Sequence, residues 1–206
     1  MAKRIIWSFG DLLSIKLRDG LFTISQMLAS PTMRFYDIRS TDGNWKNIDL
    51  NSVNHLFQVF VASRLINVHL AQGKIRDATV ISDCRPPEPL WLKSYTILID
   101  GDHYKGTKDS FSFLGGKIID IGTEGKIGTT LAPVIKEDLS LPEDRELIEK
   151  YELDNMWSHE DLSDRLCRYF DTGINRDDLK FEVFPGLWND REKLRPLTRR
   201  LPVPLR

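Results

Sequence analysis

The densest group of side chains that could do chemistry in this sequence is the segment Asp100-Gly101-Asp102-His103. Carboxylate and imidazole groups bind several divalent metals, so Asp100, Asp102 and His103 could supply half of a metal site. The alternative is a turn in which the aspartates accept hydrogen bonds from their own backbone. We prefer the turn, because none of the four histidines forms a His-x-x-x-His or His-Glu-x-x-His pattern. The sequence therefore predicts no metal and no cofactor.

Nucleophilic catalysis and nucleotide binding are not indicated elsewhere in the sequence. No serine lies in a Gly-x-Ser-x-Gly elbow. Cys84 precedes Arg85, and a neighbouring cation can lower the pKa of a thiol, but no histidine is evidently paired with this cysteine. The glycines at positions 122, 125 and 128 lack the lysine that a phosphate-binding loop places beside its last glycine. We therefore expect a protein that is not an enzyme.

Length and composition predict an ordinary folded protein. The chain has 206 residues, of which 41% are hydrophobic and 29% charged, and its net charge is −1. These values favour one domain with appendages and give no overall charge that would favour nucleic acid or a membrane surface. No run of eighteen apolar residues occurs, and Met1–Asp11 lacks the apolar region of a signal peptide. With only two widely spaced cysteines, Cys84 and Cys167, we expect a cytoplasmic protein with reduced thiols.

The segment Phe9–Leu28, which reads FGDLLSIKLRDGLFTISQML, gives the clearest structural signal. Apolar and polar residues alternate before and after Asp19-Gly20, and this pattern is typical of a β-hairpin. Glycine takes a positive φ without steric cost, so Gly20 permits a tight turn that fixes the register of the two strands. We expect this hairpin to form the first two strands of a mostly antiparallel sheet.

Further strands and two helices follow the hairpin. Strands are predicted over residues 33–38, 55–62, 76–81, 95–99 and 177–184, with a second hairpin around Gly115-Gly116 that joins residues 111–114 to 117–121. Helices are predicted near residues 142–152 and 158–171, the second of which begins after the N-cap Ser158 and ends at Gly173. The predicted fold class is α+β, a twisted antiparallel sheet or partial barrel with C-terminal helices packed against it.

Charge and composition divide the chain into three parts. Residues 1–136 are predicted to form a β-rich domain, residues 137–190 an acidic helical extension packed on the same domain, and residues 191–206 a basic tail that contains prolines. Residues 137–164 hold eleven acidic and two basic residues, a net charge of −9, whereas the tail carries +5. The acidic stretch is either a solvated helix face, with acids favoured by the helix dipole, or a surface for a cationic partner.

If the acidic stretch is a surface for a cationic partner, the residues that bind this partner should lie on exposed helix faces. They are Asp144, Glu149, Glu152, Glu160 and Asp161. If the interface lies on the sheet instead, exposed aromatic residues such as Trp45 and Trp91 are the expected anchors.

The hairpin segment also resembles the opening motif of the immunity protein 26 family of bacterial polymorphic toxin systems, in which a Gly-Asp pair precedes an apolar strand, a short turn and an aromatic-containing strand. The matching residues are Gly10, Asp11, Ile15, Leu17, Asp19, Gly20, Phe22, Gln26 and Leu28. Later segments fit in the same order, namely Phe35-Tyr36-Asp37 with Phe57–Ala62, and then Asp77–Ile81 leading to Pro86-Pro87 and Trp91. The resemblance covers about residues 5–115 and leaves the C-terminal third unmatched.

This resemblance implies a non-catalytic antitoxin in the cytoplasm, which protects the producing cell by binding a cognate protein toxin such as a nuclease. It implies neither nucleic acid nor a membrane as a partner. The same family label is shared with a small phosphotriesterase-like protein, so a metal-dependent hydrolase of phosphoesters is the alternative function. In that case Asp100, Asp102 and His103, together with His55 or His69, would have to hold the metal.

Overall fold

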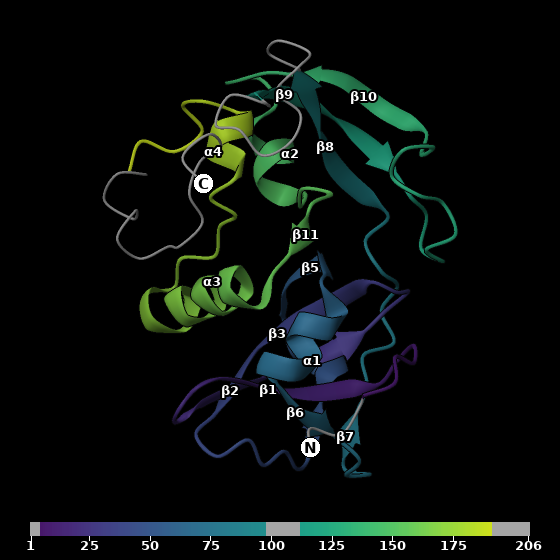
Figure 1. The fold of residues 1–206 in the computed structure, drawn as a ribbon, viewed down its shortest axis with the longest axis vertical. Coiled ribbons are helices and arrows are strands. Elements are labelled where there is room, and N and C mark those ends of the chain that lie inside the picture. The colour runs from purple at the N-terminus through teal and green to yellow at the C-terminus, as the bar shows by residue number, and fades with distance from the viewer. Residues whose placement is uncertain (1–4, 98–111, 191–206) are drawn as a thin grey trace. The chain divides into compact units, whose positions relative to one another are not determined.

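The structure, a computed structural model, describes residues 5–97 and 112–190 (Figure 1). Its internal contacts divide the chain into two compact units. Unit 1 comprises Met1–Glu88, Thr123–Gly125 and Asn155–Asn175, and unit 2 comprises Pro89–Gly122, Lys126–Asp154 and Arg176–Arg206. These boundaries differ from the predicted division between residues 136 and 137, because each unit takes segments from both halves of the chain.

Unit 1 is built on a curled six-stranded sheet with the strand order β11-β5-β3-β2-β1-β6. The strands are β1 (Leu12–Arg18), β2 (Leu21–Met27), β3 (Thr32–Ser40), β5 (His55–Val61), β6 (Ala71–Lys74) and β11 (Met156–Trp157). Neighbouring strands are antiparallel except for β11 and β5, which run parallel. The predicted α+β fold, with a twisted and mostly antiparallel sheet, is therefore confirmed.

The hairpin predicted around Asp19-Gly20 is formed by β1 and β2. Its register pairs Lys16 with Phe22 and Arg18 with Leu21, with a bulge between the two pairs. Gly20 has a φ of +71°, which lies in the left-handed region that glycine favours. The turn therefore depends on glycine for its backbone conformation.

Replacing Gly20 with valine is expected to lower the free energy of unfolding by about 1–3 kcal/mol, because a β-branched residue resists positive φ. A Cβ atom at this position would meet no heavy atom within 4 Å, so the expected cost comes from the backbone alone. Urea denaturation of the variant measures it. Gly128→Val is the control, since Gly128 has neither a left-handed φ nor a close neighbour, and equal midpoints for the two variants would contradict the prediction.

The two faces of the sheet in unit 1 are covered by different elements. One face packs against helices α1 (Ser63–His69) and α3 (His159–Thr172). The buried residues of this core are Leu13, Ile15, Met27, Met33, Phe35, Phe57, Val59, Val61, Ile66, Leu70, Trp157, Leu162 and Leu166. The other face packs against connecting segments through Leu12, Ile24, Tyr36, Trp45, Leu50 and Val80. Both faces are thus removed from water, which explains why β1, β2 and β3 are buried over consecutive residues.

The segments that cover the second face contain little regular structure. Strand β4 (Ile48–Asp49) pairs in parallel with β7 (Val80–Ile81), and a single 3-10 turn, η1 (Leu50–Ser52), follows β4. Of the strand predicted over residues 76–81, only the last two residues are extended and paired.

Helix α3 confirms the helix predicted over residues 158–171. The hydroxyl of Ser158 accepts a hydrogen bond from the backbone N–H of Asp161 at 3.2 Å, as an N-cap residue does. Gly173 ends the helix with a φ of +76°, and its N–H donates to the carbonyl of Tyr169. Leu162 and Leu166, one turn apart, are fully buried against the sheet, and each such burial stabilises the fold by about 1.5–3 kcal/mol.

Unit 2 contains a three-stranded antiparallel sheet and two short helices. The strand order is β10-β9-β8, with β8 at Leu90–Ile97, β9 at Ser112–Asp120 and β10 at Val134–Leu139. The helices are α2 (Arg145–Lys150), within the range predicted near 142–152, and α4 (Lys180–Val183). The core residues are Leu92, Ile118, Leu139, Ile148, Tyr151, Leu153, Leu179, Val183, Phe184 and Leu187.

Two predicted elements of unit 2 are wrong. Residues 111–121 do not form a hairpin around Gly115-Gly116, because β9 continues through both glycines between β8 and β10. A Cβ atom on Gly116 would lie 2.7 Å from the carbonyl oxygen of Lys93, so glycine serves here for close approach of two strands. The strand predicted over residues 177–184 is also absent, since the short helix α4 occupies this range.

Candidate interaction surface

Asp144 does not lie on an exposed helix face, and its assignment to the partner-binding set is wrong. The residue is only 6% exposed. Its carboxylate pairs with Lys136 and accepts the backbone N–H of Ser140 at 3.0 Å, and the hydrogen bond from Lys136 is the main cause of its lowered pKa. Asp144 therefore ties the end of β10 to the start of α2.

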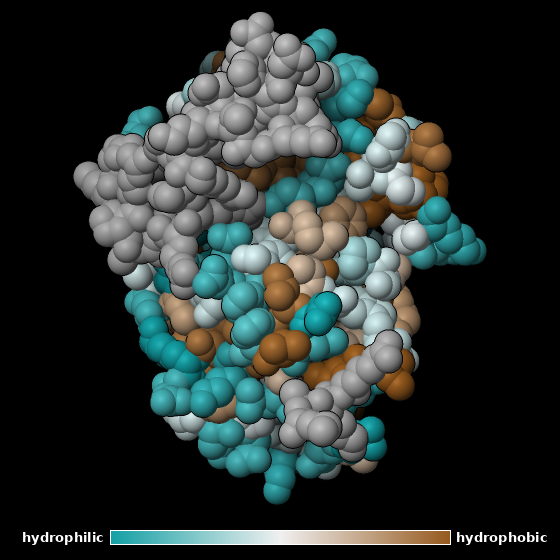
Figure 2. All heavy atoms as spheres, in the orientation of Figure 1, coloured by the Kyte–Doolittle hydropathy of each residue, from teal (hydrophilic) through white to brown (hydrophobic). Residues whose placement is uncertain are grey.

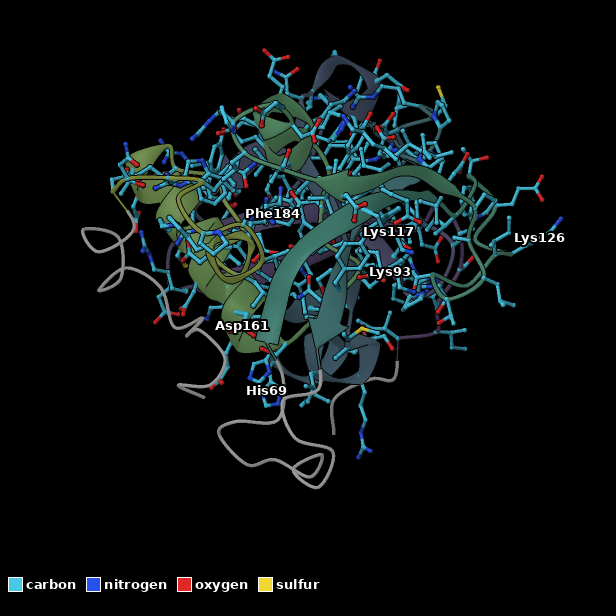
Figure 3. All side chains as sticks on the ribbon, turned by 90° about the horizontal axis from the view of Figure 1, so that it is seen from above. His69, Lys93, Lys117, Lys126, Asp161 and Phe184 are labelled. Carbon is cyan, nitrogen blue, oxygen red and sulfur yellow. The ribbon has the colours of Figure 1, made fainter. Side chains whose placement is uncertain are left out.

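The other four residues of the predicted set are divided between the two units. In unit 2, Glu149 is exposed and pairs with Arg145 at 3.1 Å on α2, and Glu152 is half-buried. In unit 1, Glu160 is exposed, whereas Asp161 is half-buried and accepts a hydrogen bond from the hydroxyl of Ser158 at 3.1 Å (Figure 3). The structure therefore does not bring the predicted acidic residues together within one unit.

The residues considered for a metal site are only partly described. Asp100, Asp102 and His103 lie outside the described residues. His55 is held near Arg34 and Arg85, and burial together with these charges lowers its pKa. His69 instead stacks on His159, with ring centroids 4.0 Å apart. Within residues 5–97 and 112–190, no group of three or more His, Cys, Asp or Glu side chains could hold a metal ion.

Neither tryptophan expected as an exposed anchor is available on the surface. Trp45 is 6% exposed and its ring N–H donates to the hydroxyl of Ser14 at 2.9 Å, while Trp91 on β8 is fully buried. The prediction that these aromatic residues could anchor a partner is wrong, because both rings are part of the interior of their own unit.

Unit 1 also contains a buried polar cluster around Asp83. The carboxylate of Asp83 accepts hydrogen bonds from Arg34 at 2.8 Å, from Tyr36 at 3.2 Å and from the Nε and Nη2 atoms of Arg85 at 2.8 Å each. Arg34 also donates to the carbonyls of Arg85 and Pro86. The guanidinium of Arg85 thus binds Asp83, while the thiol and N–H of Cys84 donate to Asn51 at 2.9 Å each. This cluster holds the segment 83–86 on the sheet.

Among the described residues of unit 2, the most exposed apolar side chains are gathered in one short stretch of chain. They belong to Ile127, Leu131, Val134 and Ile135, which we call the β10 patch. Leu131 is 85% exposed and Ile135 is 56% exposed. Figure 2 shows hydrophobic surface over β10 and the loop before it, at the upper right. Contiguous apolar surface of this kind marks interaction sites more often than scattered single residues do.

Two residues of the β10 patch, Val134 and Ile135, lie on the edge strand of their sheet, and the other two, Ile127 and Leu131, precede this strand. Among the described residues, β10 pairs with β9 alone, so its other edge carries no strand. Two irregularities in the register interrupt the pairing with β9, and Asp138 has a φ of +48°. Such irregularities limit unspecific pairing of an edge strand. The exposed side chains of β10, more than its backbone, are therefore the features that a partner could recognise.

Two acidic residues beside the patch are fixed in position by Tyr95 of β8. The hydroxyl of Tyr95 donates to Glu137 at 2.6 Å and accepts the N–H of Asp138 at 3.2 Å. Lys117 on β9 also pairs with Glu137, at 3.4 Å (Figure 3). The hydrogen bond to Glu137 is the main cause that raises the pKa of Tyr95 to about 12. The apolar patch thus borders acidic groups whose positions are set before any partner binds.

The sequence interpretation missed this surface because it predicted no strand between residues 121 and 177 and sought partner-binding residues among the acids after position 136. The pair Val134-Ile135 is β-branched, and β-branched residues are enriched in strands, so a signal for β10 was present.

Fold and surface together define an α+β protein with an exposed apolar strand edge, and no helix among the described residues is long and apolar enough to cross a membrane. A family model described as a domain of unknown function (DUF8309) matches residues 2–189, and the chain belongs to this family. No curated protein and no solved structure matches the chain. The resemblance to the immunity protein 26 family stays a prediction.

Proposed function

We propose that this protein is an immunity protein that binds and neutralises a cognate bacterial toxin in the cytoplasm of the producing cell. The observation that supports the proposal is the β10 patch, in which four large apolar side chains are exposed within nine residues of each other. Leaving such side chains in water is unfavourable, and a partner that covers them would gain the free energy of their burial. The resemblance of the sequence to the immunity protein 26 family indicates that this partner is a toxin.

The charges around the patch favour a partner with a basic surface. Glu137 and Asp138 adjoin the patch on β10, and both are exposed. Complementary charge mainly increases the rate of association and excludes wrong partners, while the apolar centre of an interface supplies most of the affinity. A nuclease toxin, whose cleft must attract a polyanion, has this kind of surface.

The proposal predicts that a toxin is encoded next to the gene for this chain, and the toxin domain of that protein provides the test. Co-expression of the chain should protect cells from that domain, and calorimetry should give a defined Kd. The double variant Leu131→Asp with Ile135→Asp should raise the Kd by about 100-fold or more and abolish protection, because two carboxylates would be buried without partners.

The control is Val68→Asp, which places one carboxylate on an apolar residue of α1 that is also exposed. This variant should bind and protect like the original protein. A double variant that binds the toxin with an unchanged Kd would exclude the β10 patch as the interface. Failure of the original protein to bind or protect would contradict the proposed function itself.

A further inference from the structure

A groove of about 660 Å³ opens in unit 1 at the end of the first hairpin. It lies among the tip of the β1–β2 hairpin, the end of β3, residues 41–48 and the C-terminal end of α3. Its walls combine apolar side chains, including Ile38 and Ile48, with charged groups. Its volume lies in the range of sites that bind small molecules, whereas its lining is more polar than is usual for such sites, which favours a charged ligand.

Three cations and one carboxylate line the groove, which gives it a net charge of +2. The cations are Arg18, Arg39 and Lys46, and the carboxylate is Asp171. Arg18 holds Asp171 through two hydrogen bonds of 2.6 and 2.7 Å, so these two charges neutralise each other. Arg39 donates to the carbonyl of Phe170 through Nη1 only. The charges of Arg39 and Lys46 also act on the carboxylates of Asp171 and Asp77, respectively, but among the described residues neither cation forms a salt bridge. Their positive charges are therefore the ones that remain for a ligand.

The loop that carries Lys46 is fixed before any ligand binds. The hydroxyl of Ser40 accepts the N–H groups of Asp42 and Gly43, and Asp42 accepts two hydrogen bonds from Asn44. The hydrogen bond from the Asn44 backbone, together with those from the Ser40 hydroxyl and the Asn44 side chain, lowers the pKa of Asp42 to about 2.

The same loop also packs tightly onto the sheet. A Cβ atom on Gly43 would lie 2.9 Å from the Phe22 ring, so only glycine allows this approach. Trp45 is anchored to Ser14 from the interior. A groove with preformed walls loses little conformational entropy on binding.

We infer that this groove binds a small molecule that carries a phosphate monoester, a role independent of toxin binding. The phosphate group interacts with Arg39 and Lys46, and the apolar part of the molecule contacts Ile38 and Ile48. A phosphate monoester carries a charge close to −2 at neutral pH, which matches the charge of these two cations, whereas a single carboxylate would leave one of them unmatched. Guanidinium and ammonium groups both bind phosphate oxygens through charge-assisted hydrogen bonds.

The experiment is a titration of the full-length, ¹⁵N-labelled chain with phenyl phosphate, followed by amide chemical shifts. We expect saturable shifts confined to residues 38–48 and the adjoining hairpin tip, and a Kd at least tenfold lower than the Kd for phenol. Lys46→Gln should raise the Kd about tenfold. The spectrum of this variant away from the groove should be unchanged, because Lys46 is exposed.

Arg64→Gln is the matched control, since it removes one exposed positive charge from α1 without touching the groove. This control should leave the Kd unchanged. The inference is overturned if the shifts do not saturate, if phenol binds as well as phenyl phosphate, or if Arg64→Gln weakens binding as much as Lys46→Gln does. The toxin-binding experiment can succeed or fail separately, because its variants lie in another unit.

Discussion

Replacing Asp83 with alanine is expected to lower the free energy of unfolding by about 3–5 kcal/mol. The side chain of Asp83 is inaccessible to water and lies between the guanidinium groups of Arg34 and Arg85. The guanidinium of Arg34 is itself buried, and Asp83 is the carboxylate that pairs with it. The variant would leave a buried positive charge without that carboxylate, and urea denaturation at pH 7 measures the loss.

The same carboxylate should make stability depend on pH in the acid range. Burial by itself would raise the pKa of Asp83, but hydrogen bonds from Arg85 and the charges of Arg34 and Arg85 lower it to about 2. Since the unfolded value is about 3.9, the ionised form stabilises the fold above about pH 4, and this contribution is lost as the pH falls toward about 2. The difference in stability between the original protein and Asp83→Ala should therefore shrink over that interval.

A matched control for Asp83 is Asp19→Ala. Asp19 also pairs with a cation, Lys16 at 2.6 Å, but it is exposed in the hairpin turn. An exposed pair contributes little, so this variant should lower the denaturation midpoint far less than Asp83→Ala does. Equal midpoints for Asp83→Ala and Asp19→Ala would show that the polar cluster does not stabilise unit 1.

Trp157→Ala is expected to cost about 3–5 kcal/mol of unfolding free energy, the range for removal of a fully buried tryptophan. The indole stacks on the ring of Phe57, with centroids 6.5 Å apart, and the guanidinium of Arg165 lies 5.2 Å from it. The variant leaves a cavity where β11, β5 and α3 meet and removes one of the aromatic surfaces that cover a buried cation. Thermal and urea unfolding both measure this loss.

The neighbouring residue on the same strand provides the control for Trp157. Met156 is 55% exposed and alternates with Trp157 on β11. Met156→Ala should change stability little, because its side chain already contacts water. A loss as large as that of Trp157→Ala would mean that the strand, not the tryptophan ring, accounts for the effect.

The parts of the fold that sequence alone predicts are those with local signals. The hairpin around Gly20 is determined by its Asp-Gly turn and by alternation on both sides of it. Helix α3 is determined by Ser158 and Gly173 at its ends and by an apolar stripe between them. These features act within a few residues, so the hairpin and the helix can be predicted without knowing which other elements they pack against.

The errors arise where distant contacts decide the structure. Gly115-Gly116 has the composition of a turn, yet β8 and β10 hold both residues in a continuous strand. Helix α1 was not predicted, because residues 68–74 combine the end of a helix with the start of β6. Asp144 looks like a surface acid in the sequence, but Lys136 and Ser140 enclose it. The number of acidic residues along a sequence does not reveal which of them form ion pairs and hydrogen bonds inside the fold.

The division of the chain into interleaved units has a consequence for synthesis. The core of unit 1 begins with β1 near the N-terminus but needs Trp157, Leu162 and Leu166, which are made far later. During translation, the apolar face of the sheet in unit 1 is covered only in part, by α1, until α3 has left the ribosome. Most of unit 2 is synthesised during that interval. Emergence of residues 155–175, which include the last strand β11 and helix α3, therefore sets the time at which the nascent chain can bury the core of unit 1.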